Sequence, residues 1–281
     1  MTDDSLKNRI EKHFASGTAA IDDPAAMAAF EELRSALEWG EIRAAEPDPD
    51  SAAGWRVNAW VKQGILLGFR LGHLAPSGSG LPFIDKHTYP VRGFSPEENI
   101  RIVPGGSSVR AGAYLAKSVV CMPPMYINTG AYVDEGTMID SHALVGSCAQ
   151  VGERVHLSAA SQLGGVLEPV NATPVILEDD VLVGGNCGVY EGTIVRKRAV
   201  LAAGTILTRG TPVYDVVKGT VLRAAPETPL IIPEGAVVVP GSRAIQKGRA
   251  AEWGLSLYTP VIVKYRDEKT ELSLALEDLL R

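Results

Sequence analysis

The sequence predicts a parallel β-helix with a helical region before it and a small cap after it. The main observation is a six-residue repeat, since every sixth residue from Val109 to Leu163 is apolar. After a break of 14 residues, the same spacing resumes at Leu177 and continues to Val213. Such repeats are typical of prisms in which each unit is one short strand and three units complete a coil. A β-sandwich alternates with a period of two and would not keep seventeen apolar residues in this phase.

The other positions of each unit fit the corners of such a prism. The apolar residue is expected to point inward and to stack on its equivalent one coil later. A small residue often stands four positions on, where the corner is tight: Ala131, Thr137, Ala143, Ala149, Ser161, Cys187, Ala199 and Thr205. Parallel crossovers are normally right-handed. Because this repeat resembles that of known hexapeptide proteins, whose usual coil is left-handed, we expect a left-handed parallel β-helix.

Composition narrows the class of protein. The 281 residues suggest one or two domains, and 46% hydrophobic with only 6% aromatic residues fits a narrow aliphatic interior. A net charge of −6 does not favour nucleic-acid binding, and three cysteines do not suggest a disulfide framework. The N-terminal residues lack the apolar stretch of a signal peptide, and no apolar run is long enough to span a membrane. We therefore expect a cytoplasmic protein that binds neither nucleic acid nor membranes.

Residues 1–100 lack the repeat and predict a small helical domain with a connector. Residues 5–15 form an amphipathic segment, and Asp23 before Pro24 marks the start of a second helix, which should end at Gly40. Residues 55–71 are predicted as a third, largely buried helix. Residues 72–100 are rich in Gly, Pro and Ser and are predicted as the connector.

Residues 101–243 are predicted as the β-helix. The proline-rich stretch 122–125 keeps the phase but does not suit a regular strand, and residues 168–175 form the loop at the break. Residues 214–233 are a second excursion, followed by a final partial coil. Residues 244–281 are the predicted cap, with a strand near 255–269 and a closing helix that begins after Thr270. Such a segment shields the last apolar cross-section from water.

A β-helix of this kind is most often an acyltransferase, although fold alone does not decide function. The groove between packed prisms is long and straight and suits an extended pantetheine arm. If the break adds two residues to one coil, a column of small residues follows this groove: Gly146, Gly164, Gly184 and Ala202, with Gly185 and Ala203 beside it. Ala203 and Gly204 are then candidate cofactor-binding residues. The alternative is that these are only corner residues of the repeat.

Several distinctive runs lie within about residues 55–270 and include non-repeat segments: WVKQGILLGFR, RIVP, INTGAYVDEGTMIDSHALVGSCAQVG, VHLSAASQLGGVLEP and SLYTPVIVK. These runs resemble the tetrahydrodipicolinate N-succinyltransferase family of the diaminopimelate–lysine pathway. The resemblance implies a homotrimer with active sites between subunits. It also implies transfer of a succinyl group from succinyl-CoA to the amino group of hydrated tetrahydrodipicolinate, without a metal. The products would be N-succinyl-2-amino-6-oxopimelate and CoA.

The resemblance also assigns site residues. The family's substrate-contacting arginine corresponds to Arg101 and its catalytic aspartate to Asp140, which also contacts substrate. A carboxylate can hold the attacking amine and accept its proton, and an arginine pairs with carboxylates through two hydrogen bonds. Without the resemblance, Asp140 would be interpreted as an exposed turn residue and Arg101 as a member of a surface ion pair.

Two positions depart from the family pattern. Gly188 stands where better-known members carry a glutamate proposed to act beside the aspartate, and Glu191 lies three residues on, on a different corner or face. A two-carboxylate mechanism is therefore in doubt. His142 replaces a tryptophan that commonly follows the aspartate by two. The histidine either assists proton transfer or fills the aromatic's space.

Other interpretations stay open. The basic residues 196–198 either meet the phosphates of CoA or form a solvated corner. An N-acetyltransferase, or another acyl-CoA transferase on the same scaffold, differs only in the acyl donor. A zinc hydratase of this fold needs three histidines around an interface, and only His142 and His156 lie in the repeat. A non-enzymatic scaffold would bind no CoA.

Overall fold

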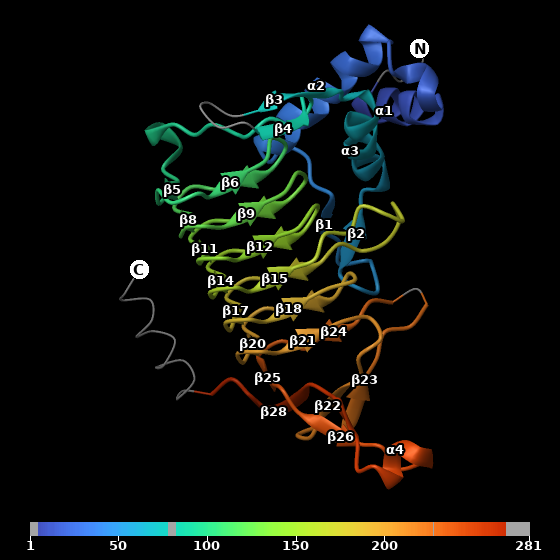
Figure 1. Ribbon diagram of the computed structural model, residues 1–281, viewed down its shortest axis with the longest axis vertical. Coiled ribbons are helices and arrows are strands. Elements are labelled where there is room, and N and C mark those ends of the chain that lie inside the picture. Colours follow the sequence, from blue (N-terminus) through green and yellow to red (C-terminus); the bar gives the residue numbers. More distant parts are fainter. Residues whose placement is uncertain (1–4, 78–82, 227, 268–281) are drawn as a thin grey trace.

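The computed structural model describes residues 5–77, 83–226 and 228–267. Its centre is a triangular prism of short parallel strands, with helices at one end and a strand-rich cap at the other (Figure 1). The left-handed parallel β-helix predicted from the repeat, with a helical region before it, is therefore the observed fold. The three sides of the prism are called face 1, face 2 and face 3, in the order in which the chain visits them.

Each face is a ladder of strands, most of them two residues long. Face 1 holds β5 (Arg101–Ile102), β8 (Val120–Cys121), β11 (Met138–Ile139), β14 (His156–Leu157), β17 (Leu182–Val183), β20 (Val200–Leu201) and β25 (Ala236–Val239). Face 2 holds β6 (Ser108–Val109), β9 (Tyr126–Ile127), β12 (Leu144–Val145), β15 (Gln162–Leu163), β18 (Gly188–Val189) and β21 (Ile206–Leu207). Face 3 holds β7 (Tyr114–Leu115), β10 (Tyr132–Val133), β13 (Gln150–Val151), β16 (Ile176–Leu177), β19 (Ile194–Val195) and β24 (Ile231–Ile232).

The residues of the repeat form the core of the prism. Every apolar position from Val109 to Val213 belongs to one buried cluster, because the second residue of each strand points inward. Their stacking removes an aliphatic column from water, which is the main force that stabilises such a coil. Val213 is the exception in topology, since it begins β22 (Val213–Asp215) instead of extending face 3. Strand β22 pairs with β23 (Thr220–Leu222) and β28 (Val261–Tyr265).

The loop after Leu163 is longer than the expected geometry allowed. Paired residues in complete coils are 18 apart, as in Leu144 and Gln162, but Leu163 pairs with Val189, 26 residues on. The loop therefore inserts eight residues, and the expectation of two was wrong. Consequently Gly164 lies beside Tyr190, while Gly184 lies beside Ala202 on another edge. The single column of small residues expected from the sequence does not exist.

Three helices precede the prism: α1 (Leu6–Ala15), α2 (Pro24–Glu38) and α3 (Ala59–Leu71), with 3₁₀ turns at Gly17–Ala20 and Pro96–Glu98. The Asp23 side chain caps α2 by accepting a hydrogen bond from the Ala25 N–H at 2.9 Å, as the Asp-Pro signal predicts. The third helix was predicted too long, because residues 55–57 instead form β2 (Trp55–Val57). This strand pairs with β1 (Ala45–Pro47).

The predicted connector contains a hairpin of β3 (Leu74–Ser77) and β4 (Phe83–Lys86). Upstream of it, residues 43–57 lie against face 3. The Arg43 guanidinium lies 3.6 Å from the centroid of the Tyr132 ring, and the Trp55 indole N–H donates to the Glu178 carboxylate at 3.0 Å. Ile176 and Ile194, two of the outward residues of this face, are fully buried against this segment. The chain thus covers its own face 3.

The C-terminal part closes the other end of the prism. It comprises β22, β23 (Thr220–Leu222), β26 (Ser242–Ala244), α4 (Gly248–Glu252), β27 (Ser256–Tyr258) and β28 (Val261–Tyr265). Strand β28 runs antiparallel to β25 and parallel to β22, so it extends face 1 and shields the end of the core. The closing helix expected after Thr270 lies outside the described residues.

Candidate active site

Asp140 lies on the edge where the chain turns from face 1 to face 2. It follows β11, and its main-chain N–H donates to the carbonyl of Leu157 on the next coil at 2.9 Å. The carboxylate accepts a hydrogen bond from the N–H of Ser141 at 2.7 Å. This contact orients the side chain at the turn, where it is half-buried. The carboxylate is therefore held at the edge and can accept a further hydrogen bond from a bound amine.

The same edge carries the predicted cofactor-binding residues. The strand register aligns Asp140 with Ser158, Gly184 and Ala202 on successive coils, and Ala203 and Gly204 complete the last of these turns. At the usual strand spacing, Asp140 and Ala202 are about 15 Å apart. Ala203 is exposed and Gly204 has a φ of 77°. Without large side chains, this end of the edge leaves its backbone accessible.

Gly184 is small for a reason internal to the prism. A Cβ atom added there would lie 2.5 Å from the main-chain nitrogen of Ala203 on the next coil. The glycine therefore permits the close approach of two coils. The interpretation of the small residues as corner positions thus accounts for Gly184, while Ala203 stays a candidate for contact with a cofactor.

Arg101 lies on the same face as the strand that leads to Asp140. It pairs with Val120, which in turn pairs with Met138, so Arg101 is two rungs from β11 and shares its outward side. Its side chain is exposed. From the strand rise and spacing, the Cα atoms of Arg101 and Asp140 are roughly 12 Å apart. When both side chains are extended, a dicarboxylate bound between Arg101 and Asp140 can contact both of them.

The two histidines differ in setting. His142 is exposed at the turn after Asp140, with a φ of 62°, and its carbonyl accepts a hydrogen bond from the Gln162 amide at 3.3 Å. His156 is half-buried in β14 on face 1. It therefore lies within a strand and not at a coil turn. Among the described residues, no group of three or more His, Cys, Asp or Glu side chains is arranged to hold a metal ion.

Gly188 lies beneath an aromatic ring. A Cβ atom added to Gly188 would be 2.4 Å from the Tyr190 ring, and one added to Gly164 would be 2.8 Å from it. The two glycines thus form the surface on which this ring rests. The space of a side chain at position 188 is taken by Tyr190, whose hydroxyl lies 2.9 Å from the same Cβ position.

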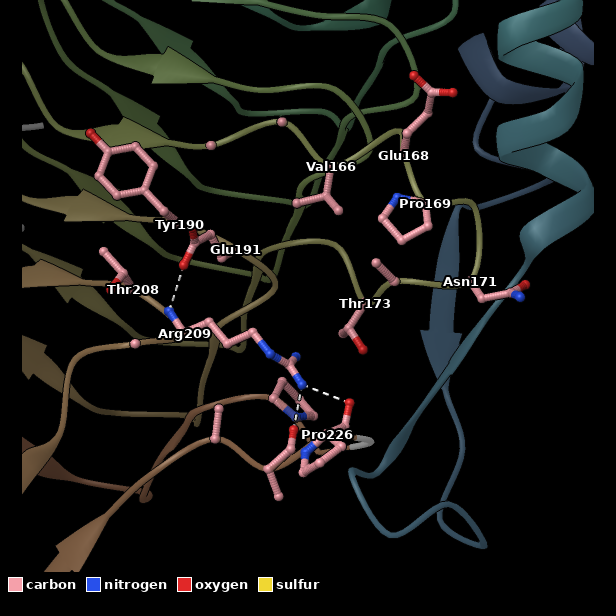
Figure 2. Close-up of a pocket in the computed structure, with 17 residues that line it drawn as sticks. Val166, Glu168, Pro169, Asn171, Thr173, Tyr190, Glu191, Thr208, Arg209 and Pro226 are labelled. Atoms are coloured by element: carbon pink, nitrogen blue, oxygen red, sulfur yellow. Dashed lines mark hydrogen bonds between the residues drawn. The ribbon is translucent and has the colours of Figure 1, made fainter.

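A wide cleft lies on the edge between faces 2 and 3. It has a volume of about 1420 Å³ and is bounded by the inserted loop on one side and by residues 224–226 and Pro229 on the other (Figure 2). Tyr190 stands at one end of it, and Thr173 projects from the loop. Glu191 accepts a hydrogen bond from the Arg209 N–H at 2.9 Å, while the guanidinium of Arg209 donates to the carbonyls of Ala225 and Pro226.

Sequence reasoning missed this cleft, although it located both segments that form it as excursions. Glu191 lies here, on the opposite edge of face 2 from Asp140, so the two carboxylates do not meet within one chain.

The basic cluster at residues 196–198 lies on neither of these two edges. Arg196 follows β19 on the edge between faces 3 and 1, where it pairs with Glu178 at 2.5 Å and donates to the carbonyl of Ala53 at 2.8 Å. It holds the segment that covers face 3.

Two family models match the chain. One, described as tetrahydrodipicolinate N-succinyltransferase N-terminal, matches residues 5–71, and the other, the hexapeptide repeat of succinyl-transferase, matches residues 174–209. Together with the prism, these matches define a hexapeptide-repeat transferase.

Relatives narrow the class. A 2,3,4,5-tetrahydropyridine-2,6-dicarboxylate N-succinyltransferase of Azoarcus sp. (strain BH72) is 43% identical over 99% of this chain and 96% of its own. The enzyme of the same name from Acinetobacter baylyi is 41% identical over 98% of each chain. The chain belongs to the tetrahydrodipicolinate N-succinyltransferase family. A solved Campylobacter jejuni structure, described as a 2,3,4,5-tetrahydropyridine-2-carboxylate N-succinyltransferase, aligns with 83% of this chain and 62% of its own, at 16% identity and a TM-score of 0.47.

Proposed function

We propose that this protein transfers the succinyl group of succinyl-CoA to the amino group of hydrated tetrahydrodipicolinate, in the diaminopimelate branch of lysine biosynthesis. The observation that carries the proposal is the 43% identity over almost the whole chain with an enzyme named for this reaction. The geometry is consistent with it, since Asp140 and Arg101 share one side of the prism and Ala203 and Gly204 lie along the adjoining edge.

The chemistry needs few groups. The amine nitrogen attacks the thioester carbonyl carbon, and Asp140 accepts the proton that the nitrogen loses. The tetrahedral intermediate collapses, the carbon–sulfur bond breaks, and the CoA sulfur leaves and takes up a proton. Arg101 holds a substrate carboxylate through paired hydrogen bonds. No covalent enzyme intermediate forms, because the thioester is already activated.

The proposed assembly is a homotrimer with active sites between subunits. Its support is the unequal covering of the prism. Face 3 is covered by residues 43–57 of the same chain, whereas faces 1 and 2 carry half-buried outward apolar residues such as Met138 and Leu144. The Asp140 edge and the cleft lie along the two opposite edges of face 2. We therefore propose that acyl-CoA lies between the Asp140 edge of one subunit and the cleft of its neighbour.

The remaining assignments are proposed with it. We propose three parts of the chain: an N-terminal helical domain with a connector at residues 1–100, the β-helix at residues 101–243 and a C-terminal capping segment at residues 244–281. Within the described residues, no helix is both long and apolar enough to cross a lipid bilayer. We propose a cytoplasmic enzyme that needs no metal.

Steady-state assays of CoA release test the function. With tetrahydrodipicolinate as acceptor, succinyl-CoA should give a kcat/KM at least about tenfold above that of acetyl-CoA, because a built subsite must pair the distal carboxylate. A preference for acetyl-CoA would identify an N-acetyltransferase. Absence of turnover together with absence of CoA binding in calorimetry would identify a scaffold.

Co-expression of two inactive variants tests the shared site. Asp140→Asn disables the edge, and Thr173→Trp fills the cleft. If each site uses the edge of one subunit and the cleft of the next, random mixing restores about a quarter of the sites, since each site draws its two halves independently. If both halves come from one chain, no mixed trimer contains an intact site and activity stays at the level of the single variants.

A further inference from the structure

Lys62 carries a buried cation that has no part in the site described above. It lies on α3, its side chain is fully buried, and its ammonium donates a hydrogen bond to the carbonyl of Ala172 at 2.5 Å. Burial lowers the pKa of Lys62, while the nearby thiol of Cys148 is itself buried and has a pKa of about 12. No carboxylate within the described ranges forms an ion pair with this lysine.

A buried ammonium without a counter-ion is an unfavourable choice for stability. Its removal from water costs free energy that one hydrogen bond to a neutral carbonyl does not fully offset. An apolar residue of similar length would fill the same space among the helices without that cost. A lysine at this position therefore indicates a role other than stability. Its hydrogen bond connects it to Ala172, which belongs to the inserted loop.

The loop lies between the helices and the prism, and it approaches both closely near Ala172 and Thr173. On the side of the helices, Lys62 holds Ala172, and Leu167 packs against the buried cluster of α1, α2 and α3. On the side of the prism, the carbonyl of Thr173 lies 2.4 Å from where a Cβ atom of Gly192 would stand. Ala172 and Thr173 both line the cleft. The distance across the cleft at this point therefore depends on the helical region.

We propose that Lys62 is a positioning residue for the cleft, and that the N-terminal helices serve to set the path of the loop through it. Lys62 touches no substrate in this scheme. It fixes the carbonyl of Ala172, which places Thr173 at the wall of the cleft. The kinetic part rests on the proposed function, with acyl-CoA as the occupant of the cleft, because 1420 Å³ far exceeds the space that a small dicarboxylate fills.

Lys62→Met is the test variant, since it removes the donor and keeps the apolar stem. Hydrogen exchange by mass spectrometry on the full-length chain should show exchange across residues 166–175 at least about tenfold faster than in the unaltered chain, with α3 unchanged. The KM for succinyl-CoA should rise about fivefold with kcat within about twofold, the pattern of a lost binding geometry. Lys62→Gln, which donates but is too short to reach, should behave in the same way.

Arg70→Met is the matched control. Arg70 lies on the same helix and also donates to main-chain carbonyls, those of Phe14 at 2.8 Å and Gly17 at 3.3 Å, on the side away from the cleft. It should loosen α1 and leave both the loop and the KM unchanged. Loop exchange that is unaltered in Lys62→Met would overturn the proposal, and so would loss of the whole fold in both Lys62 variants. Loop exchange is read without any substrate, so it tests the positioning role even if the proposed reaction is wrong.

Discussion

The two long edges of face 2 are built in different ways. The edge that carries Asp140 is a plain succession of turns, in which Ser158, Gly184 and Ala202 follow at regular register. The edge that carries Tyr190 is interrupted by eight inserted residues, and residues 224–226 and Pro229 line the other side of the cleft there. The first edge is straight and offers exposed backbone, whereas the second offers a cavity. The difference shows how one regular coil can present a carboxylate on one side and a cleft on the other.

The largest expected effect is a loss of kcat when Asp140 is replaced, and it distinguishes the Asp140 edge from the other edges of the prism. Asp140→Asn should lower kcat at least about tenfold, because an amide cannot accept the amine proton. Thermal unfolding should be unchanged, since the Ser141 N–H can still donate to the amide oxygen. Turnover of succinyl-CoA measures the effect.

Asp134→Asn provides its control. Asp134 occupies the same repeat position on the edge between faces 3 and 1, and it accepts the same kind of turn hydrogen bond, from the Glu135 N–H at 2.9 Å. This variant should keep full activity. Equal losses in the two variants would mean that the aspartate serves the turn and not the chemistry.

The next effect concerns the open end of face 1. Arg101→Ala should raise the KM for the dicarboxylate about tenfold and leave kcat within about twofold, because a charge-assisted pair contributes about 1.5–3 kcal/mol to binding. Arg9→Ala, which breaks only a surface ion pair with Glu32, should leave both constants unchanged. A rise confined to the KM for succinyl-CoA would move Arg101 to the acyl donor.

A smaller effect concerns the cleft edge. Gly188→Ala should lower the free energy of unfolding by about 1 kcal/mol, because the new methyl group forces the Tyr190 ring off its glycine surface. The loss should disappear when the same substitution is made in a Tyr190→Ala background. Thermal unfolding of the four chains measures this coupling. If the two substitutions are simply additive, the ring does not rest on Gly188 in solution.

The smallest effect is a pH dependence from Lys62. Its folded pKa is lowered by burial from the ordinary value of 10.5, so the unfolded chain binds more protons between the two values. The free energy of unfolding therefore rises with pH in that window. Lys62→Met should lack this rise, so the unaltered chain gains stability relative to the variant as pH increases toward 10.5. A constant difference between the two chains across alkaline pH would contradict the lowered pKa of Lys62.

The sequence alone determined the prism, because an apolar residue at every sixth position stacks into one continuous core in a three-sided coil. It also located both excursions from the coil, and its resemblance to the family supplied Asp140 and Arg101 as predicted site residues. It did not determine how many residues the loop adds to one coil, since spacing along the chain does not show which strands pair across an insertion. Only the tertiary structure showed that Gly164 lies beside Tyr190 and Gly184 beside Ala202. It alone brought Lys62 to Ala172, 110 residues on, because such contacts depend on how helices and prism pack.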